Sequence, residues 1–181
     1  MNNEELKNNL DQNLELYKQL EFEKKIEEAI DKLDQLADQQ KELAKENAEK
    51  EVPKEEALSE QKKAEEEFNK IEEEIKKAEE LNDQLSEPFN FEMDTAQSNE
   101  IKSDLQKANE NLQKGKQKKA SESQDSAGDK MKEMANSLSM MMESAMMEQM
   151  GEDAEQVKKM LDNLLDLSFE QEKLIKSYEE V

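Results

Sequence analysis

The sequence predicts an all-α protein, an elongated antiparallel helical bundle or set of coiled-coil hairpins made of about four long helices. Apolar residues recur at alternating steps of three and four along most of the chain, the spacing of helices that pack side by side. Only two prolines and three glycines interrupt the 181 residues. We expect a first helical hairpin over residues 1–85, a connecting loop over 86–97 and a second, methionine-rich hairpin over 98–181.

The first expected helix spans residues 3–50. Its clearest apolar seam is Ile26, Ile30, Leu33, Ala37, Gln40, Ala44 and Asn47. An earlier stripe is formed by Leu6, Leu10, Leu14, Tyr17 and Leu20. The two do not share one register, which predicts a stutter between Phe22 and Ile26. Pro53 ends the helix, because proline disfavours the α conformation of the residue before it.

The second expected helix runs from Pro53 to about Leu85 and carries the most regular pattern. One heptad set is Ala57, Ala64, Ile71, Ala78 and Leu85, and the interleaved set is Gln61, Phe68, Ile75 and Asn82. This pattern indicates a coiled coil or a bundle. The glutamine and asparagine in the seam favour specific pairing, with a weak helix end as the alternative.

The connection at 86–97 contains Pro88 and three apolar residues, Phe89, Phe91 and Met93. We expect these three to plug the end of the bundle rather than to line a ligand site. Candidate N-caps for the next helix are Asp94, Thr95 and Ser98.

The third expected helix begins near Ser98 and carries Ile101, Leu105, Ala108 and Leu112. The next stretch, KGKQKKASESQDSAGDK, is either a flexible linker or part of one continuous helix, and we favour the helix. Gly151 then supplies a stop or a reversal before a fourth helix over 152–180. The predicted core seam of this half comprises Met131, Met134, Leu138, Met141, Leu161 and Leu164.

Eight of the eleven methionines fall between Met131 and Met150. Those outside the seam are candidates for interaction: Met140, Met142, Met146, Met147 and Met150. We expect them to cover the broad apolar face of the fourth helix. One alternative is a surface for partner helices, because methionine adapts to varied surfaces. Another is a site for Cu(I), which thioether sulfur binds.

Composition narrows the classes of function. The chain has no His or Cys, which removes the usual zinc, haem and iron–sulfur ligands and the commonest proton-transfer group. We therefore expect no enzyme activity and no cofactor. A net charge of −22 repels nucleic acid and anionic lipid, and no apolar run is long enough to insert into a bilayer. The charge and the low content of Leu, Ile, Val and Phe keep open an acidic, partly disordered, chaperone-like region.

Two stretches, LQKGKQKKASESQDSAGDKMKEMANSL and LDNLLDLSFEQEKLI, resemble the coiled-coil region of a large uncharacterised family of bacterial membrane proteins. The opening NLELYKQLEFEKKIEEAIDKLDQLADQQKELA is similar to an earlier part of that region. The resemblance implies a soluble excerpt of a larger protein anchored in a bacterial inner membrane, with this part in the periplasm or the cytoplasm. It implies no catalytic residues.

The sequence therefore predicts a non-catalytic structural or protein-interaction module. Its expected partner is another protein or a second copy, bound through helices.

Overall fold

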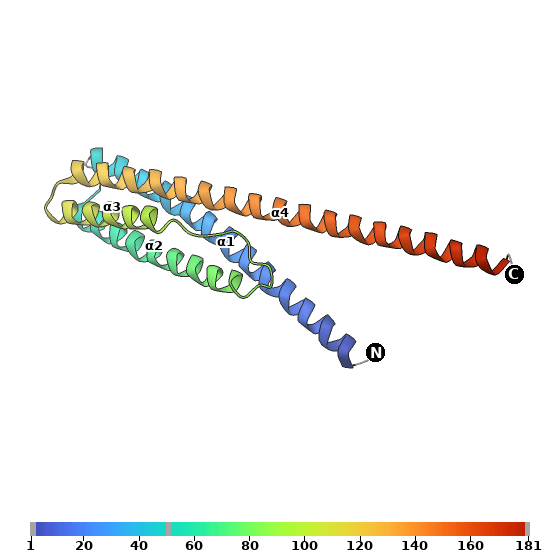
Figure 1. The fold of residues 1–181 in the computed structure, drawn as a ribbon. Helices are drawn as coiled ribbons and strands as arrows, with labels where there is room; N and C mark the ends of the chain where they lie inside the picture. Colours follow the sequence, from blue (N-terminus) through green and yellow to red (C-terminus); the bar gives the residue numbers. More distant parts are fainter. Residues whose placement is uncertain (1–2, 50–51, 180–181) are drawn as a thin grey trace. The chain divides into compact units, whose positions relative to one another are not determined.

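The computed structural model describes the backbone of residues 3–49 and 52–179, and the side chains of residues 6–7, 9–49, 52–151, 158, 159 and 161. Over this part of the chain there are four helices and no strand, which confirms the predicted all-α fold. The helices are α1 (Asn3–Glu49), α2 (Lys54–Asn82), α3 (Thr95–Gln113) and α4 (Gln117–Glu179) (Figure 1). The chain divides into two units, Met1–Met142 and Glu143–Val181, and α4 contributes to both.

The first unit is a four-helix bundle in which each helix runs antiparallel to the one before it (Figure 1). Short connections between sequential helices produce this up-down-up-down arrangement. The predicted seams form its core. All nine seam residues predicted from Ala57 to Leu85 are buried, as are Ile101, Leu105, Ala108 and Leu112 on α3. On α1, the seam from Ile26 to Asn47 is buried except for Ile30, which is partly buried against the core.

Helix α4 approaches α1 closely because Gly128 has no side chain. A Cβ atom built on Gly128 would lie 2.9 Å from the Ala37 carbonyl oxygen and 2.9 Å from Lys41 Cγ. Ion pairs of Lys41 with Asp129 and of Lys132 with Asp38 join the same two helices. The glycine therefore sets the distance between α1 and α4.

The connection Asp83–Asp94 fills the core where α3 has not yet begun. The Phe22 ring on α1 stacks on Phe89 and meets Phe91 edge to face, each with ring centroids 5.3 Å apart. Asn82 holds this segment by donating to the Phe89 carbonyl (2.9 Å) and accepting from the Phe89 N–H (2.8 Å). The prediction that these aromatic residues plug the bundle is confirmed.

Helix α3 begins at Thr95, and of the three candidate N-caps Asp94 is the one that caps it. Its carboxylate accepts from the backbone N–H groups of Ala96 (2.8 Å) and Gln97 (3.1 Å), which satisfies two donors that the first helical turn leaves open.

The prediction of one continuous helix from residue 98 to 150 is wrong, because the chain turns at Lys114–Lys116. Gly115 adopts a positive φ of 69°. The Gly115 N–H donates to the Leu112 carbonyl (3.0 Å) and the Lys116 N–H to the Asn111 carbonyl (2.8 Å). This pair of bonds is the Schellman motif, which ends helices at a left-handed glycine.

The predicted stop at Gly151 is also wrong, because α4 continues through it to Glu179. A glycine inside a helix costs about 1 kcal/mol relative to alanine, which a long helix tolerates. The reversal that makes the second hairpin therefore lies at Gly115, and residues 152–179 prolong α4 instead of folding back as a separate helix.

Candidate functional site

The N-terminal part of α1 exposes a regular apolar surface, which we call the outer leucine stripe: Leu6, Leu10, Leu14, Tyr17 and Leu20. These side chains are 51–67% exposed. The sequence indicated a stripe out of register with the later α1 seam, and the exposure of these side chains shows that they do not pack into the bundle. At about 100° per residue, its five positions lie on the side of α1 opposite to the buried positions Phe22 to Ala37.

Hydrogen bonds confirm which side of this segment faces the bundle. Glu15 accepts from the Ser86 backbone N–H, and Lys18 donates to the Gln84 carbonyl at 3.2 Å. Both residues lie on the face of α1 that continues the buried seam, so the outer leucine stripe points away from the bundle. The apolar phase thus changes between Leu20 and Phe22, close to the predicted stutter.

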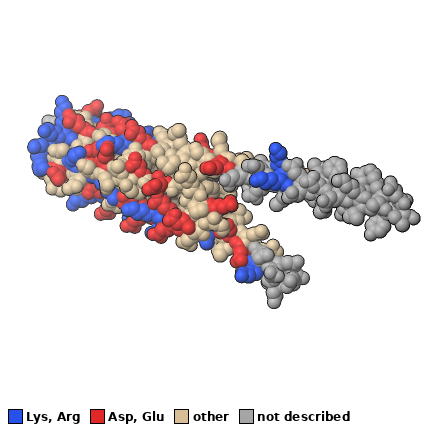
Figure 2. Space-filling view, in the orientation of Figure 1, with Lys and Arg blue, Asp and Glu red and all other residues tan. Residues whose placement is uncertain are grey.

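Carboxylates and lysines are interspersed over much of the visible face of the bundle, next to an area of uncharged residues (Figure 2). The whole chain carries 48 acidic and 26 basic residues. A ligand that docks on the outer leucine stripe therefore approaches an acidic molecule, and positively charged ligands are favoured by the long-range field.

The methionines divide between core and surface. Met131, Met134 and Leu138 are fully buried, and Met141 is partly buried against the core, as the seam predicted. Met142 is also buried in the bundle, although it was a candidate for interaction.

The four remaining candidates are exposed: Met140 (68%), Met146 (41%), Met147 (72%) and Met150 (73%). They do not cover a fourth helix, because the segment they were expected to cover is the continuation of their own helix. Leu161 of the predicted seam is 56% exposed for the same reason. Leu164 lies outside the side chains that the structure describes.

A row of buried amides links all four helices. Asn47 on α1 donates to Gln124 Oε1 on α4 (3.1 Å), Gln124 donates to Gln61 Oε1 on α2 (2.8 Å), and Gln61 donates to the Leu105 carbonyl on α3 (3.3 Å). We call this row the amide layer. All three side chains are fully buried. Because a shifted helix would break the row, the amide layer fixes the register of the bundle.

Sequence periodicity revealed only part of the amide layer. It placed Asn47 and Gln61 in seams but assigned Gln124 to a polar stretch. The signal was present once the turn is placed at Gly115, because Ala120, Gln124, Ala127 and Met131 then follow a regular spacing of four, three and four.

A second polar cluster joins α3 to α4 around Asp104, which the sequence did not indicate. Burial raises the pKa of the Asp104 carboxyl, but hydrogen bonds from Lys130 (2.8 Å), Lys107 (2.9 Å) and Ser126 (2.8 Å) outweigh it and lower the pKa to about 2. The ionised carboxylate of Asp104 therefore links α3 to α4 through its hydrogen bonds with Ser126 and Lys130.

Glu72 plays the same part between α2 and α3. Burial raises the pKa of its carboxyl, and hydrogen bonds from Lys102 (2.5 Å) and Ser98 (2.7 Å) bring the net shift downward. Ser98 is buried, so this bond also supplies a partner to a hydroxyl that water does not reach.

Among the described residues, no three carboxylates lie close enough together to hold one metal ion. Over the same part of the chain, no helix is apolar enough over sufficient length to cross a membrane. Comparison of the chain with protein-family models, with curated protein sequences and with solved structures finds no match.

Proposed function

We propose that this chain is a non-catalytic helical interaction module that binds an amphipathic helix of another protein through the outer leucine stripe. The observation that carries the proposal is the orientation of Leu6, Leu10, Leu14, Tyr17 and Leu20. They are spaced as a helix-pairing seam, they are more than half exposed, and they point away from the bundle that their own chain builds.

The energetics favour a partner on this surface. Burying a leucine side chain contributes about 1.5–3 kcal/mol, and an amphipathic helix that lies along an apolar stripe is a common mode of recognition. The partner helix should carry lysine or arginine beside its apolar face. A second copy of a chain with net charge −22 is repelled, whereas a basic helix is attracted.

The resemblance to bacterial membrane proteins is part of this proposal. In a membrane-anchored protein of this kind, the bundle would hold α1 in place so that the outer leucine stripe faces a partner.

The test is fluorescence anisotropy with a labelled synthetic helix of about three heptads, with leucine at its seam positions and lysine beside them. We expect the double variant Leu10→Ser/Tyr17→Ser to weaken binding at least tenfold. Asn9→Ser/Gln12→Ser is the matched control, because it makes neutral changes in the same segment outside the stripe and should leave affinity unchanged.

Equal affinity of both variants would overturn the proposal. So would equal binding of a peptide in which the flanking lysines are replaced by glutamate. Sedimentation that shows a dimer of the wild-type chain, lost in Leu10→Ser/Tyr17→Ser, would assign the stripe to self-association instead.

A Cu(I) site is the second candidate. Met146, Met147 and Met150 are exposed and lie within one helical turn of each other on α4, which allows their thioethers to approach one soft ion. Competition against a Cu(I) chelator tests it. The variant Met146→Leu/Met150→Leu keeps the apolar surface and should abolish competition, and a wild-type chain that never competes eliminates this function.

A further inference from the structure

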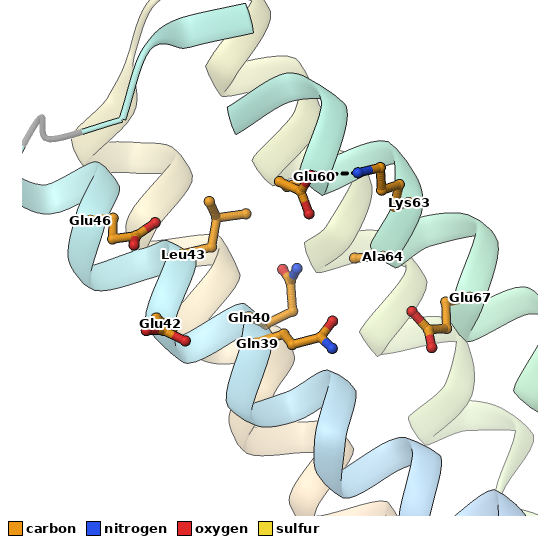
Figure 3. A pocket seen from close by; sticks show the side chains of 9 residues that line it. All are labelled: Gln39, Gln40, Glu42, Leu43, Glu46, Glu60, Lys63, Ala64 and Glu67. Atoms are coloured by element: carbon orange, nitrogen blue, oxygen red, sulfur yellow. Dashed lines mark hydrogen bonds and ion pairs between the residues drawn. The ribbon is translucent and has the colours of Figure 1, made fainter. Parts of the chain in front are cut away.

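A pocket of about 400 Å³ lies between α1 and α2, away from the outer leucine stripe. This volume is in the range of small-molecule sites. Its lining residues, shown in Figure 3, are Gln39, Gln40, Glu42, Leu43, Glu46, Glu60, Lys63, Ala64 and Glu67. The pocket exists because the small Ala64 faces α1 where a larger seam residue would fill the gap between the helices.

The pocket is strongly acidic. Four of the lining residues are glutamates and one is a lysine. The lysine, Lys63, is paired with Glu60 at 2.6 Å, so the carboxylates of Glu42, Glu46 and Glu67 leave an excess of negative charge around the opening.

Gln40 provides the second, independent feature. Its side chain is 1% exposed, and its Oε1 atom has no hydrogen-bond partner. Figure 3 shows the Gln40 amide pointing from α1 toward α2, among the side chains that line the pocket. A buried acceptor without a donor is costly, and a bound N–H group would satisfy it.

The arrangement suits an extended organic cation rather than a single metal ion. No three described carboxylates converge on one point, so the negative charge is spread along the pocket. Leu43 and Ala64 supply an apolar wall between the charged groups. A flexible chain of methylene groups that separates several ammonium groups matches both features.

We propose that this pocket binds a linear aliphatic polyamine. Its ammonium groups pair with the carboxylates of Glu46 and Glu67, and one N–H donates to Gln40 Oε1. The site does not depend on the function of the outer leucine stripe, which lies at the other end of α1.

The test is isothermal titration of spermidine into the full chain at about 150 mM salt, where nonspecific attraction between exposed charges is screened. We expect one saturable site. Gln40→Leu removes the acceptor, and Glu46→Gln/Glu67→Gln removes two carboxylates. Each should weaken binding at least tenfold, as loss of a hydrogen bond to a charged group does.

The matched control is Glu87→Gln/Glu92→Gln, which removes the same charge from exposed positions in the α2–α3 connection and should change affinity less than twofold. Equal weakening by the two charge-removing pairs would show that spermidine is only a counterion to an acidic chain. An isotherm that does not saturate, or unchanged affinity in a folded Gln40→Leu variant, would likewise overturn the proposal. If circular dichroism shows that Gln40→Leu does not fold, the comparison of Glu46→Gln/Glu67→Gln with Glu87→Gln/Glu92→Gln tests the proposal without it.

Discussion

Replacing Gly128 with alanine should destabilise the bundle, although alanine is the better helix former. In an unconstrained helix the change stabilises by about 1 kcal/mol. Here the new Cβ would lie 2.9 Å from the Ala37 carbonyl oxygen, whereas ordinary contacts begin at 3.4 Å. Helices α1 and α4 must therefore separate by about 0.5 Å, because a backbone carbonyl cannot rotate out of the way.

The magnitude follows from two opposing contributions. Overpacking of a close helix contact costs about 1–3 kcal/mol, and the gain in helix propensity offsets about 1 kcal/mol of it. The two contributions together limit the net loss in the free energy of unfolding to about 2 kcal/mol, and the approach of 2.9 Å to a backbone atom places the expected loss near that limit. Lys41 Cγ, the second close atom, belongs to a flexible side chain that can move, so the carbonyl contact determines the cost.

Urea denaturation followed by circular dichroism at 222 nm measures the effect. Gly151→Ala is the control, since it lies in the same helix with nothing within 4 Å of the new Cβ and should not lower the unfolding midpoint. A Gly128→Ala variant that unfolds at the same or a higher urea concentration than the wild type would refute the close approach of α1 and α4.

Three further outcomes are expected. The folded pKa of Asp104 is about 2 and its ordinary value is 3.8, which corresponds to a stabilisation of roughly 2 kcal/mol. This stabilisation is complete above about pH 4 and is lost as the pH falls from 3.8 toward 2. Asp104→Asn should therefore flatten this part of a pH series of thermal midpoints. Gln124→Leu orphans buried groups of Asn47 and Gln61 and should cost about 2–4 kcal/mol in urea denaturation, while replacing all three residues with leucine should restore most of that loss. Phe22→Ala should cost about 3–5 kcal/mol and make the Asp83–Asp94 connection more sensitive to limited proteolysis than the helices, and intact protection there would contradict its docking on the Phe22 ring.

Periodicity predicted the core well wherever one helix face carries a single seam. Every predicted seam position of α2 is buried, and the α3 seam is equally regular, because these two helices pack along their whole length. The spacing of three and four is a direct consequence of such packing, so it can be read without knowledge of the partner helices.

The roles of the glycines were harder to predict from the sequence, because a glycine can end a helix or lie inside one. Gly115 ends α3 with a positive φ, Gly128 permits close helix contact, and Gly151 lies inside α4 with nothing near it. The local sequences do not separate these roles. The distinction depends on the Schellman hydrogen bonds at Gly115 and on the position of α1, both of which arise from three-dimensional structure.

The acidic pocket was beyond sequence analysis for a related reason. Gln40 and Ala64 occupy ordinary seam positions, and the glutamates around them resemble any solvated helix face. The pocket arises only when a small seam residue on α2 meets a glutamine on α1, with carboxylates on both rims. The residue pattern of a single helix does not show which residues of another helix lie opposite it, so it could not predict this pocket.

The distribution of large apolar residues along α1 bears directly on the function of the chain. Toward its C-terminal end, the buried seam uses Ala37, Gln40, Ala44 and Asn47, which contribute little apolar burial and rely on the amide layer for specificity. Five of the eight leucines of α1 lie at or before Leu20 and are more than half exposed, whereas Leu33, Leu36 and Leu43 are buried in the bundle. A helix that served only to stabilise its own bundle would gain more from leucine at the seam. The buried amides fix the register and the leucines face outward, and this division of α1 into two surfaces supports the proposal that the bundle holds one surface while a partner helix binds the other.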